Sequence, residues 1–406
     1  MSVEELKQLC SVYEPMESDV GYFPFVDLKI PANIHDKLSD LPPVARHLIV
    51  TKEMLHLEED PPATKTKKLV PNLLDQENYG CIIQNLQLML ELGIELVKVR
   101  KVIKYKQSPF MRKYTSFNIQ QRISAKASGD KLSDTLYKLN DNGNFGKAIE
   151  NPRNYETTTI VFSPKMFKKK VGSMLYKSYD ENEYSMIVRS RKQKIVFNKP
   201  IYVGVYILEA SKHLMFTFWY KHLKPKFIDN TMRLMYMDTD SFIIYFKGNE
   251  TNKKLKELSN STFDFSNLPE DDELHSKVNA TRVGVLQDQT PGRKINTFRG
   301  VSPKCYLYEL EEKEEKTEEK MTYAKCKGIP ELVSDKLSRE DFEKGVLQDK
   351  EREKRDFYTI RTHQRQLVTQ HVTKRVFSFT TKRILTDDKK DSLAIGHSGA
   401  KKMKLS

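Results

Sequence analysis

The stretch "LMYMDTDSFIIYF", from Leu234 to Phe246, places two aspartates one residue apart in the middle of an apolar run. The runs on either side are rich in strand-forming residues, and residues i and i+2 of a strand share a face. The stretch therefore predicts a hairpin with Asp238 and Asp240 side by side near its tip. Two such carboxylates repel each other unless a proton or a cation lies between them, and Mg²⁺ is a suitable cation because it takes oxygen ligands and leaves positions open for phosphates. A turn that uses Asp and Thr only for local capping is the alternative, and the residues alone do not separate the two.

The composition predicts a folded protein with a polyanionic partner. The chain has 406 residues, enough for two or three subdomains, with 38% hydrophobic residues, 20 Phe and 19 Tyr. A net charge of +14 favours nucleic acid as the partner, with an acidic membrane surface second. The four cysteines lack CxxC spacing, so neither a zinc site nor a disulfide framework is predicted, and reduced thiols are expected.

Periodicity predicts an α+β chain. Residues 1–80 are expected to be rich in loops, apart from a strand at "YFPFVDLKI". Further along the chain the pattern predicts a helix over 82–92, a strand with one basic face at "IELVKVRKVIKYK", two helical pieces broken near Ser128–Gly129, a strand that continues as a largely buried helix in "YVGVYILEASKHLMFTFWYKHLK", an exposed loop or hairpin tip at 309–320, and basic strands in "VTKRVFSFTTKRIL". The first ten residues do not have the pattern of a secretory signal. The most apolar stretch carries Asn, Gln and two Glu, which predicts no membrane span.

The hairpin sequence also carries a resemblance. "YMDTDS", from Tyr236 to Ser241, resembles the YxDTDS motif of family B DNA polymerases, where it forms the palm hairpin that holds the catalytic metals. The resemblance implies that Asp240 is a direct metal ligand for Mg²⁺ or Mn²⁺, that Asp238 is a supporting carboxylate, and that Tyr236 and Thr239 lie at the primer DNA. Reverse transcriptases have adjacent aspartates at this place, so the intervening Thr disfavours an RNA-templated enzyme.

A second motif lies upstream. "KLNDNGNFGK", residues 138–147, resembles the KxxxNSxYG fingers motif of the same family, with Gly143 in place of the usual Ser. The resemblance implies that the dNTP is bound by Lys138, Asn142, Phe145 and Gly146. A cationic Lys suits a triphosphate, an aromatic ring suits the sugar, and Gly lets the backbone approach a base pair. Taken alone, the stretch would be better explained as a helix end capped by Asn and Gly.

The protein-primed branch of the family has a second phosphate-binding Lys twelve residues before this motif, which corresponds to Lys126. Arg122 is a weaker candidate for the same face, and an ordinary exposed helix charge explains it nearly as well.

Two downstream motifs point to the same branch. "SPKCYLYE" resembles its KxY motif, which implies that Lys304 and Tyr306 contact the primer strand. "YAKCKGIP" resembles the segment that follows, which implies phosphate contacts by Lys325 and Lys327. As isolated residues these would be surface charges on strands, and their order relative to the other motifs makes the case. "YKQSPFMRKYTSFNIQQR" and "TDDKKDSLAIGH" resemble polymerases of self-synthesising mobile elements and linear plasmids, so the resemblance extends from Gly21 to His397.

The resemblance implies a right-hand polymerase architecture without an exonuclease domain. The expected parts are a partial palm (1–107), fingers helices (108–155), a basic insertion (156–200), palm with the DTDS hairpin (201–290), and thumb with a basic tail (291–406). The expected partners are DNA template and primer, dNTPs and a terminal protein primer, with no membrane, at an intracellular site such as the nucleus or a place of viral or element replication.

The family's first metal-binding carboxylate, in a DxxSLYP motif, has no counterpart in the sequence. "VDLKIP" offers Asp27, but its spacing is too short and the Ser-Leu-Tyr is missing. The chain is therefore expected to be a polymerase fragment that extends primers poorly or not at all. The alternative is a relic that binds DNA without catalysis, and no motif supports a ligase or a nuclease.

Overall fold

The computed structural model describes residues 1–15, 18–57, 66–227, 231–311, 321–347, 354–363, 366–377, 382–386 and 391–401. The chain divides into two compact units. The first unit comprises Met1–Ser108, Glu209–Arg355 and Lys374–Ser406, and the second comprises Pro109–Leu208 and Asp356–Thr373. Helices and strands are mixed in both, as the α+β prediction requires.

The amino-terminal part of the first unit is an antiparallel sheet with helices packed on it. Strand β1 (Val20–Lys29) lies between β4 (Gln76–Gly80) and β5 (Glu95–Lys106), and α4 (Ile83–Glu91) precedes β5. These elements confirm the two predicted strands and the predicted helix. The first residues also hold a helix that the sequence reading missed, α1 (Val3–Val12), which Ser2 and Glu5 stabilise through a capping box. The shorter elements here are η1 (Ala32–Ile34), α2 (His35–Leu38), β2 (Ala45–Leu48), α3 (Lys52–Leu55) and β3 (Lys68–Pro71).

The stretch from Ile201 to Lys226 is helical throughout, so the strand predicted at its start is wrong. It forms α8 (Ile201–Thr217), a π-helical segment η3 (Phe218–Leu223) and α9 (Lys224–Lys226). A short apolar run fits a strand and a buried helix equally well by periodicity, which explains the error. The first half of α8 is also more exposed than predicted, with Tyr202 73% exposed.

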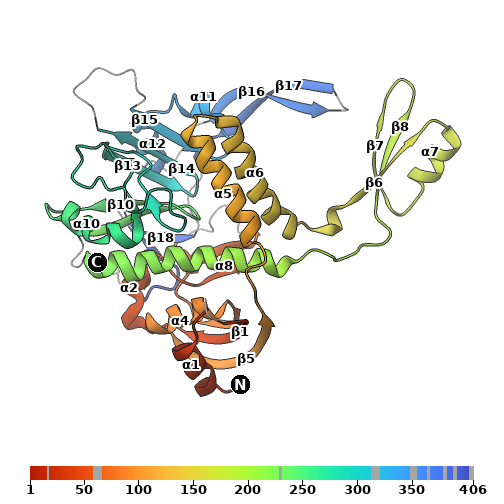
Figure 1. Cartoon of the computed structure of the whole chain (residues 1–406). Coiled ribbons are helices and arrows are strands. Elements are labelled where there is room, and N and C mark those ends of the chain that lie inside the picture. Colours follow the sequence, from red (N-terminus) through yellow and green to blue (C-terminus); the bar gives the residue numbers. More distant parts are fainter. Residues whose placement is uncertain are drawn as a thin grey trace. The chain divides into compact units, whose positions relative to one another are not determined.

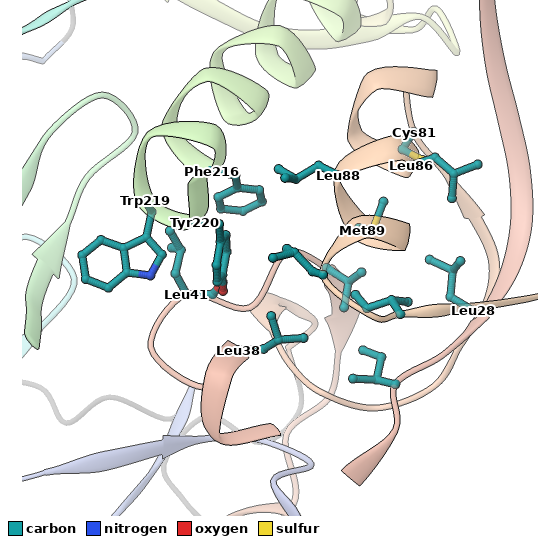
Figure 2. Packing of buried hydrophobic residues seen from close by; sticks show 14 of the residues in the cluster. Leu28, Leu38, Leu41, Cys81, Leu86, Leu88, Met89, Phe216, Trp219 and Tyr220 are labelled. Atoms are coloured by element: carbon teal, nitrogen blue, oxygen red, sulfur yellow. The ribbon is translucent and has the colours of Figure 1, made fainter. Parts of the chain in front are cut away.

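The π-helical segment supplies the centre of the first unit's core. Phe218, Trp219, Tyr220 and Leu223 of this segment are all buried. Figure 2 shows Tyr220 beside Phe216 and close to Leu41, with residues of α4 on one side and Trp219 on the other. Burying one such apolar side chain stabilises the fold by roughly 1.5–3 kcal/mol, so this cluster holds the elements that pack against it.

A second sheet of the first unit has the order β13-β14-β15 and is antiparallel. Its strands are Ile295–Ser302, Cys305–Leu310 and Thr322–Cys326. The loop predicted at 309–320 begins inside β14, and its residues 312–320 lie outside the described residues. The remaining elements of this unit are β9 (Met232–Met237), β10 (Phe242–Phe246), α10 (Thr251–Thr262), β11 (Phe263–Asp264), β12 (Leu286–Gln287), α11 (Glu331–Ser334), α12 (Arg339–Leu347), β18 (Arg383–Leu385), β19 (Ser392–Ala394) and η4 (Ser398–Lys401).

The second unit is built on two helices, α5 (Arg112–Ala127) and α6 (Lys131–Ala148), which lie side by side (Figure 1). The predicted break at Ser128–Gly129 is confirmed, and Gly129 adopts a left-handed φ of +73° there. An ion pair between Arg122 and Asp134 (2.9 Å) joins the helices, so the Arg122 charge is already engaged.

The other elements of this unit are η2 (Pro152–Asn154), β6 (Glu156–Val161), α7 (Pro164–Val171), β7 (Tyr176–Glu181), β8 (Met186–Arg191), β16 (Lys354–His363) and β17 (Gln366–Arg375). The first residues of β16 and the last residues of β17 belong to the first unit. Strands β6, β8 and β7 form one antiparallel sheet within the predicted basic insertion. Across the described ranges, no helix is both long and apolar enough to cross a membrane.

Candidate active site

The predicted carboxylate hairpin is present, formed by β9 and β10 with a tight turn at Asp238–Ser241. The Asp238 N–H donates to the Ser241 carbonyl (3.1 Å), which closes the turn. Thr239 has a left-handed φ of +61°. That conformation is rare for a β-branched residue and costs of the order of 1–3 kcal/mol, so surrounding contacts must hold the turn in place.

A β-bulge in β9 determines which way the hairpin tip faces. Ile243 pairs with Tyr236 whereas Ile244 pairs with Leu234, so Met235 is an extra residue in β9. Leu234 packs on the core before the bulge, and Met237 packs on it after the bulge. Tyr236 is therefore turned away from the core, and Asp238, two residues on, points to the same side.

The partner strand β10 also packs on the core. Phe242 of β10 stacks on Phe218 with 5.9 Å between ring centroids, and it also lies 5.8 Å from Trp219. These contacts fix the base of the turn to the centre of the core. The two aspartates thus project from a rigid support, which a binding or catalytic site needs.

A second hairpin turn meets this tip. It joins β13 and β14 through Pro303 and Lys304, and Lys304 has a φ of +61°. The Lys304 N–H donates to the Tyr236 hydroxyl (3.0 Å), and the Lys304 ammonium lies 2.5 Å from an Asp238 carboxylate oxygen. The Tyr306 ring packs on the Tyr236 ring at 4.7 Å. Lys304 is 66 positions from Asp238 and 68 positions from Tyr236 along the chain. Two polar contacts and one aromatic contact thus join the two hairpin turns at a single point.

The charges at this junction are coupled. The Asp238 carboxylate hydrogen-bonds the Lys304 ammonium and raises the pKa of Lys304, and the nearby Asp240 charge raises this pKa further. Burial raises the pKa of Tyr236 and of Tyr306, so both hydroxyls stay protonated at neutral pH. The site therefore presents the Lys304 ammonium against the Asp238 carboxylate and within the electrostatic influence of Asp240.

A cavity of about 370 Å³ opens beside the junction. The side chains and backbone that line it belong to Asp238, Lys304, Tyr306, Ala324, Lys325, Cys326, Lys327, Ile329, Glu331 and Ser334. The structure thereby brings together the predicted residues of the DTDS, KxY and YAKCKG segments, apart from Thr239 and Asp240, which are exposed on the turn itself. Glu331 was missed by the sequence reading, because it directly follows the YAKCKGIP segment and is not part of the motif.

The other predicted site residues belong to the second unit. Lys138, Asn142, Phe145 and Gly146 lie at positions i, i+4, i+7 and i+8 of α6, so they share one helix face. The Arg122 hydrogen bond lowers the pKa of Asp134, and the nearby Lys126 and Lys138 ammoniums lower it further. Lys126 of α5 and Lys138 of α6 therefore lie near one carboxylate and present two cations on the same helix pair.

The Asp27 carboxylate is held by its neighbours in the first sheet. Arg100 approaches it with two nitrogens, at 2.5 and 2.9 Å, and the Asn78 N–H donates to it (2.8 Å). These contacts, with Arg100 first, lower the pKa of Asp27. Both carboxylate oxygens are thus engaged within the first sheet, in keeping with the expectation that Asp27 is not the missing metal ligand.

The hairpin tip supplies two carboxylates as candidate metal ligands. In the part of the chain that the structure describes, no group of three or more His, Cys, Asp or Glu is placed to hold a metal ion. Mg²⁺ is commonly held by one or two carboxylates together with substrate phosphates and water, so the Asp238 and Asp240 pair fits one side of such a site.

Comparisons with known proteins give a distant likeness to one solved structure. No protein-family model matches the chain, and no curated protein is significantly similar to it. The solved structure of Phi29 DNA polymerase complexed with primer-template DNA and incoming nucleotide substrates is similar at a TM-score of 0.40 and 11% identity, covering 88% of this chain and 50% of that one. This chain therefore spans half the length of that polymerase, and a likeness at this TM-score carries no argument about fold or activity.

Proposed function

We propose that this chain is part of a DNA-directed DNA polymerase of the protein-primed B type, which transfers nucleotides to a primer by a two-metal mechanism. The observation that carries the proposal is the junction of Tyr236 and Asp238 with Lys304 and Tyr306. The sequence motifs assign these residues to metal binding and to the primer strand, and their side chains lie in contact.

The chain's own residues would divide the work as follows. Asp238 and Asp240 would hold the metal ions, with Asp240 as the direct ligand. Metal ions so held lower the pKa of the primer 3′-hydroxyl and stabilise the charge that develops on the leaving pyrophosphate. Lys304, Lys325 and Lys327 line a cavity beside these carboxylates, where ammonium groups would bind primer phosphates.

The paired ammonium of Lys304 also explains how the carboxylates are tolerated before substrate arrives. It lies 2.5 Å from Asp238 and offsets the repulsion between the two aspartates. Binding of metal and DNA phosphates would separate this ion pair, because the carboxylate then gains a divalent cation and the ammonium gains a phosphate.

The helix pair of the second unit would bind the incoming nucleotide. Lys126 and Lys138 are exposed and lie near one carboxylate, so their charges are available to a triphosphate. Phe145 would pack on the sugar, and Gly146 and Asn142 would lie at the base pair. A terminal protein primer and an origin in a mobile element or linear plasmid belong to the same proposal.

A DNA-binding chain without catalysis is the second candidate. It is favoured by the lack of a DxxSLYP motif in the sequence, since loss of one ligand from a two-metal site costs several kcal/mol of transition-state stabilisation. Both candidates predict salt-sensitive DNA binding, because phosphate contacts release counterions.

Primer extension by the purified chain tests the proposal. We expect weak extension that requires both template and Mg²⁺, that Asp240→Asn abolishes, and that Asp271→Asn leaves unchanged. Asp271 is an exposed carboxylate of the same unit that does not line the cavity, so it is a matched control. DNA binding without extension fits both candidates, which nucleotide-dependent DNA affinity then separates, and an absence of DNA binding would contradict both.

A further inference from the structure

Two of the four cysteines lie directly beneath the candidate active site. Cys305 of β14 is paired with Cys326 of β15, and their sulfurs are 3.7 Å apart. Both side chains are buried, and both are free thiols. The residues on either side of them in the strands are Lys304, Tyr306, Lys325 and Lys327, which belong to the candidate site.

The register of the two strands makes this pair suited to a covalent bond. The Lys327 N–H donates to the Lys304 carbonyl (3.0 Å), and the Leu310 N–H donates to the Met321 carbonyl (2.9 Å). Hydrogen-bonded and non-hydrogen-bonded pairs alternate along an antiparallel ladder, so Cys305 and Cys326 are a non-hydrogen-bonded pair. In such a pair the Cα atoms are about 4.5 Å apart, which lies within the range of natural disulfides.

The two thiols are also unequal, as a reactive pair requires. The Cys305 thiol hydrogen-bonds the sulfur of Cys326 and lowers the pKa of Cys326, whereas this contact and burial raise the pKa of Cys305. Cys326 is also one of the residues that line the cavity, which gives a small oxidant a route to it. Burial alone raises the pKa of Cys10, to about 11, so that thiol is a poor nucleophile by comparison.

We propose that Cys305 and Cys326 form a reversible cross-strand disulfide, with a low-molecular-weight disulfide such as oxidised glutathione as the oxidant. The Cys326 thiolate attacks one glutathione sulfur, the glutathione S–S bond breaks, and one glutathione leaves as the thiol. The Cys305 sulfur already lies against that of Cys326, so the Cys305 thiol then loses its proton as it attacks the Cys326 sulfur of the mixed disulfide and expels the second glutathione. The two protein thiols are thereby oxidised, one glutathione disulfide is reduced, and the two thiol protons end on the released glutathione molecules.

The bond would act on the candidate site because the neighbouring side chains alternate to the opposite face of the sheet. The two sulfurs are 3.7 Å apart, and a disulfide requires about 2.05 Å. Closing the bond therefore reorients both cysteine side chains and shifts the two strands locally, which displaces Lys304 and Tyr306 relative to Lys325 and Lys327. DNA affinity should fall several-fold on oxidation. This effect rests on the proposed function, whereas disulfide formation itself does not.

The covalent step is tested on the full chain in glutathione redox buffers, with free thiols alkylated before peptide mass spectrometry. We expect a linked pair of peptides carrying Cys305 and Cys326, reversed by dithiothreitol, with Cys10 and Cys81 alkylated in full after denaturation. Loss of the linked pair in both Cys305→Ser and Cys326→Ser is also expected. Oxidation of all four cysteines at one rate, or no linked pair, would overturn the proposal.

The effect on the site is tested by DNA affinity in the oxidised and reduced states. Redox sensitivity should be lost in Cys305→Ser and kept in the matched control Cys10→Ser. A linked pair with unchanged affinity would overturn the displacement of the four side chains. A linked pair in a chain that binds no DNA in either state would contradict the proposed function and leave the disulfide established.

Discussion

The two glycines of α6 offer a pair of substitutions whose effects on stability and on function should diverge. Gly143 and Gly146 lie in the interior of the helix, and neither has a positive φ. A Cβ added at either position meets none of the described atoms within 4 Å. Alanine is therefore tolerated sterically at both positions, and it is a better helix former than glycine.

The expected gain is about 0.5–1 kcal/mol for each substitution, because alanine loses less conformational freedom on folding. Gly143→Ala and Gly146→Ala should thus raise the melting temperature of the 406-residue chain by roughly 1 °C and by similar amounts. Only Gly146 corresponds to the motif position where backbone meets a base pair. Gly146→Ala should therefore weaken nucleotide binding about tenfold or more, the equivalent of about 1.4 kcal/mol, whereas Gly143→Ala should leave it unchanged.

Thermal unfolding gives the first quantity, and nucleotide-dependent binding to primer–template DNA gives the second. Equal nucleotide affinity for the two variants would refute the assignment of Gly146 to the base pair. A loss of stability in both variants would instead show that the helix is packed against something at these positions.

Three further predictions concern charge, pH and packing. Lys325→Ala should weaken DNA binding for every sequence and reduce the salt dependence of log Kd by about 0.9, while Lys256→Ala, an exposed charge outside the cavity, should not. A hydrogen bond from Lys147, together with weaker ones from Tyr155 and Lys199, lowers the pKa of Glu150 from 4.5 to about 2. The ionised carboxylate therefore stabilises the fold above pH 4.5, and this contribution is lost as the pH falls towards 2. The melting temperature of Glu150→Gln should accordingly lie below wild type at pH 7, and the difference should vanish across that window rather than persist. Leu86 is fully buried, so Leu86→Ala should cost about 2–5 kcal/mol in urea unfolding, and a cost below about 1 kcal/mol would show that the core has been misplaced.

Much of the local structure can be predicted from the sequence. Alternating residues identified β1 and β5, helical spacing identified α4, and Ser128–Gly129 marked the end of α5. These elements follow from periodicity and turn chemistry, which act over a few residues. The start of α8 was misread, because its apolar run has no period that separates strand from helix.

The candidate site was only partly predictable for a different reason. The DTD stretch indicates a hairpin, but both of its strands are apolar, so alternation cannot reveal the bulge at Met235. That bulge turns Tyr236 towards Lys304 and sends Met237 to the core. Contacts with β13 and β14, far along the chain, decide this arrangement, and Glu331 reaches the cavity through the same long-range packing.

Selection of a nucleotide at the Asp238–Asp240 site can be measured as the affinity for a primer–template whose 3′ end is a dideoxynucleotide. Such a primer blocks chemistry, so the result does not depend on the first carboxylate motif. With Mg²⁺ and the next correct dNTP, we expect tighter DNA binding than with a mismatched dNTP, and we expect this difference to be lost in Asp240→Asn but kept in Asp271→Asn. Equal affinity with matched, mismatched and no nucleotide would contradict this expectation and leave a chain that binds DNA without selecting a nucleotide.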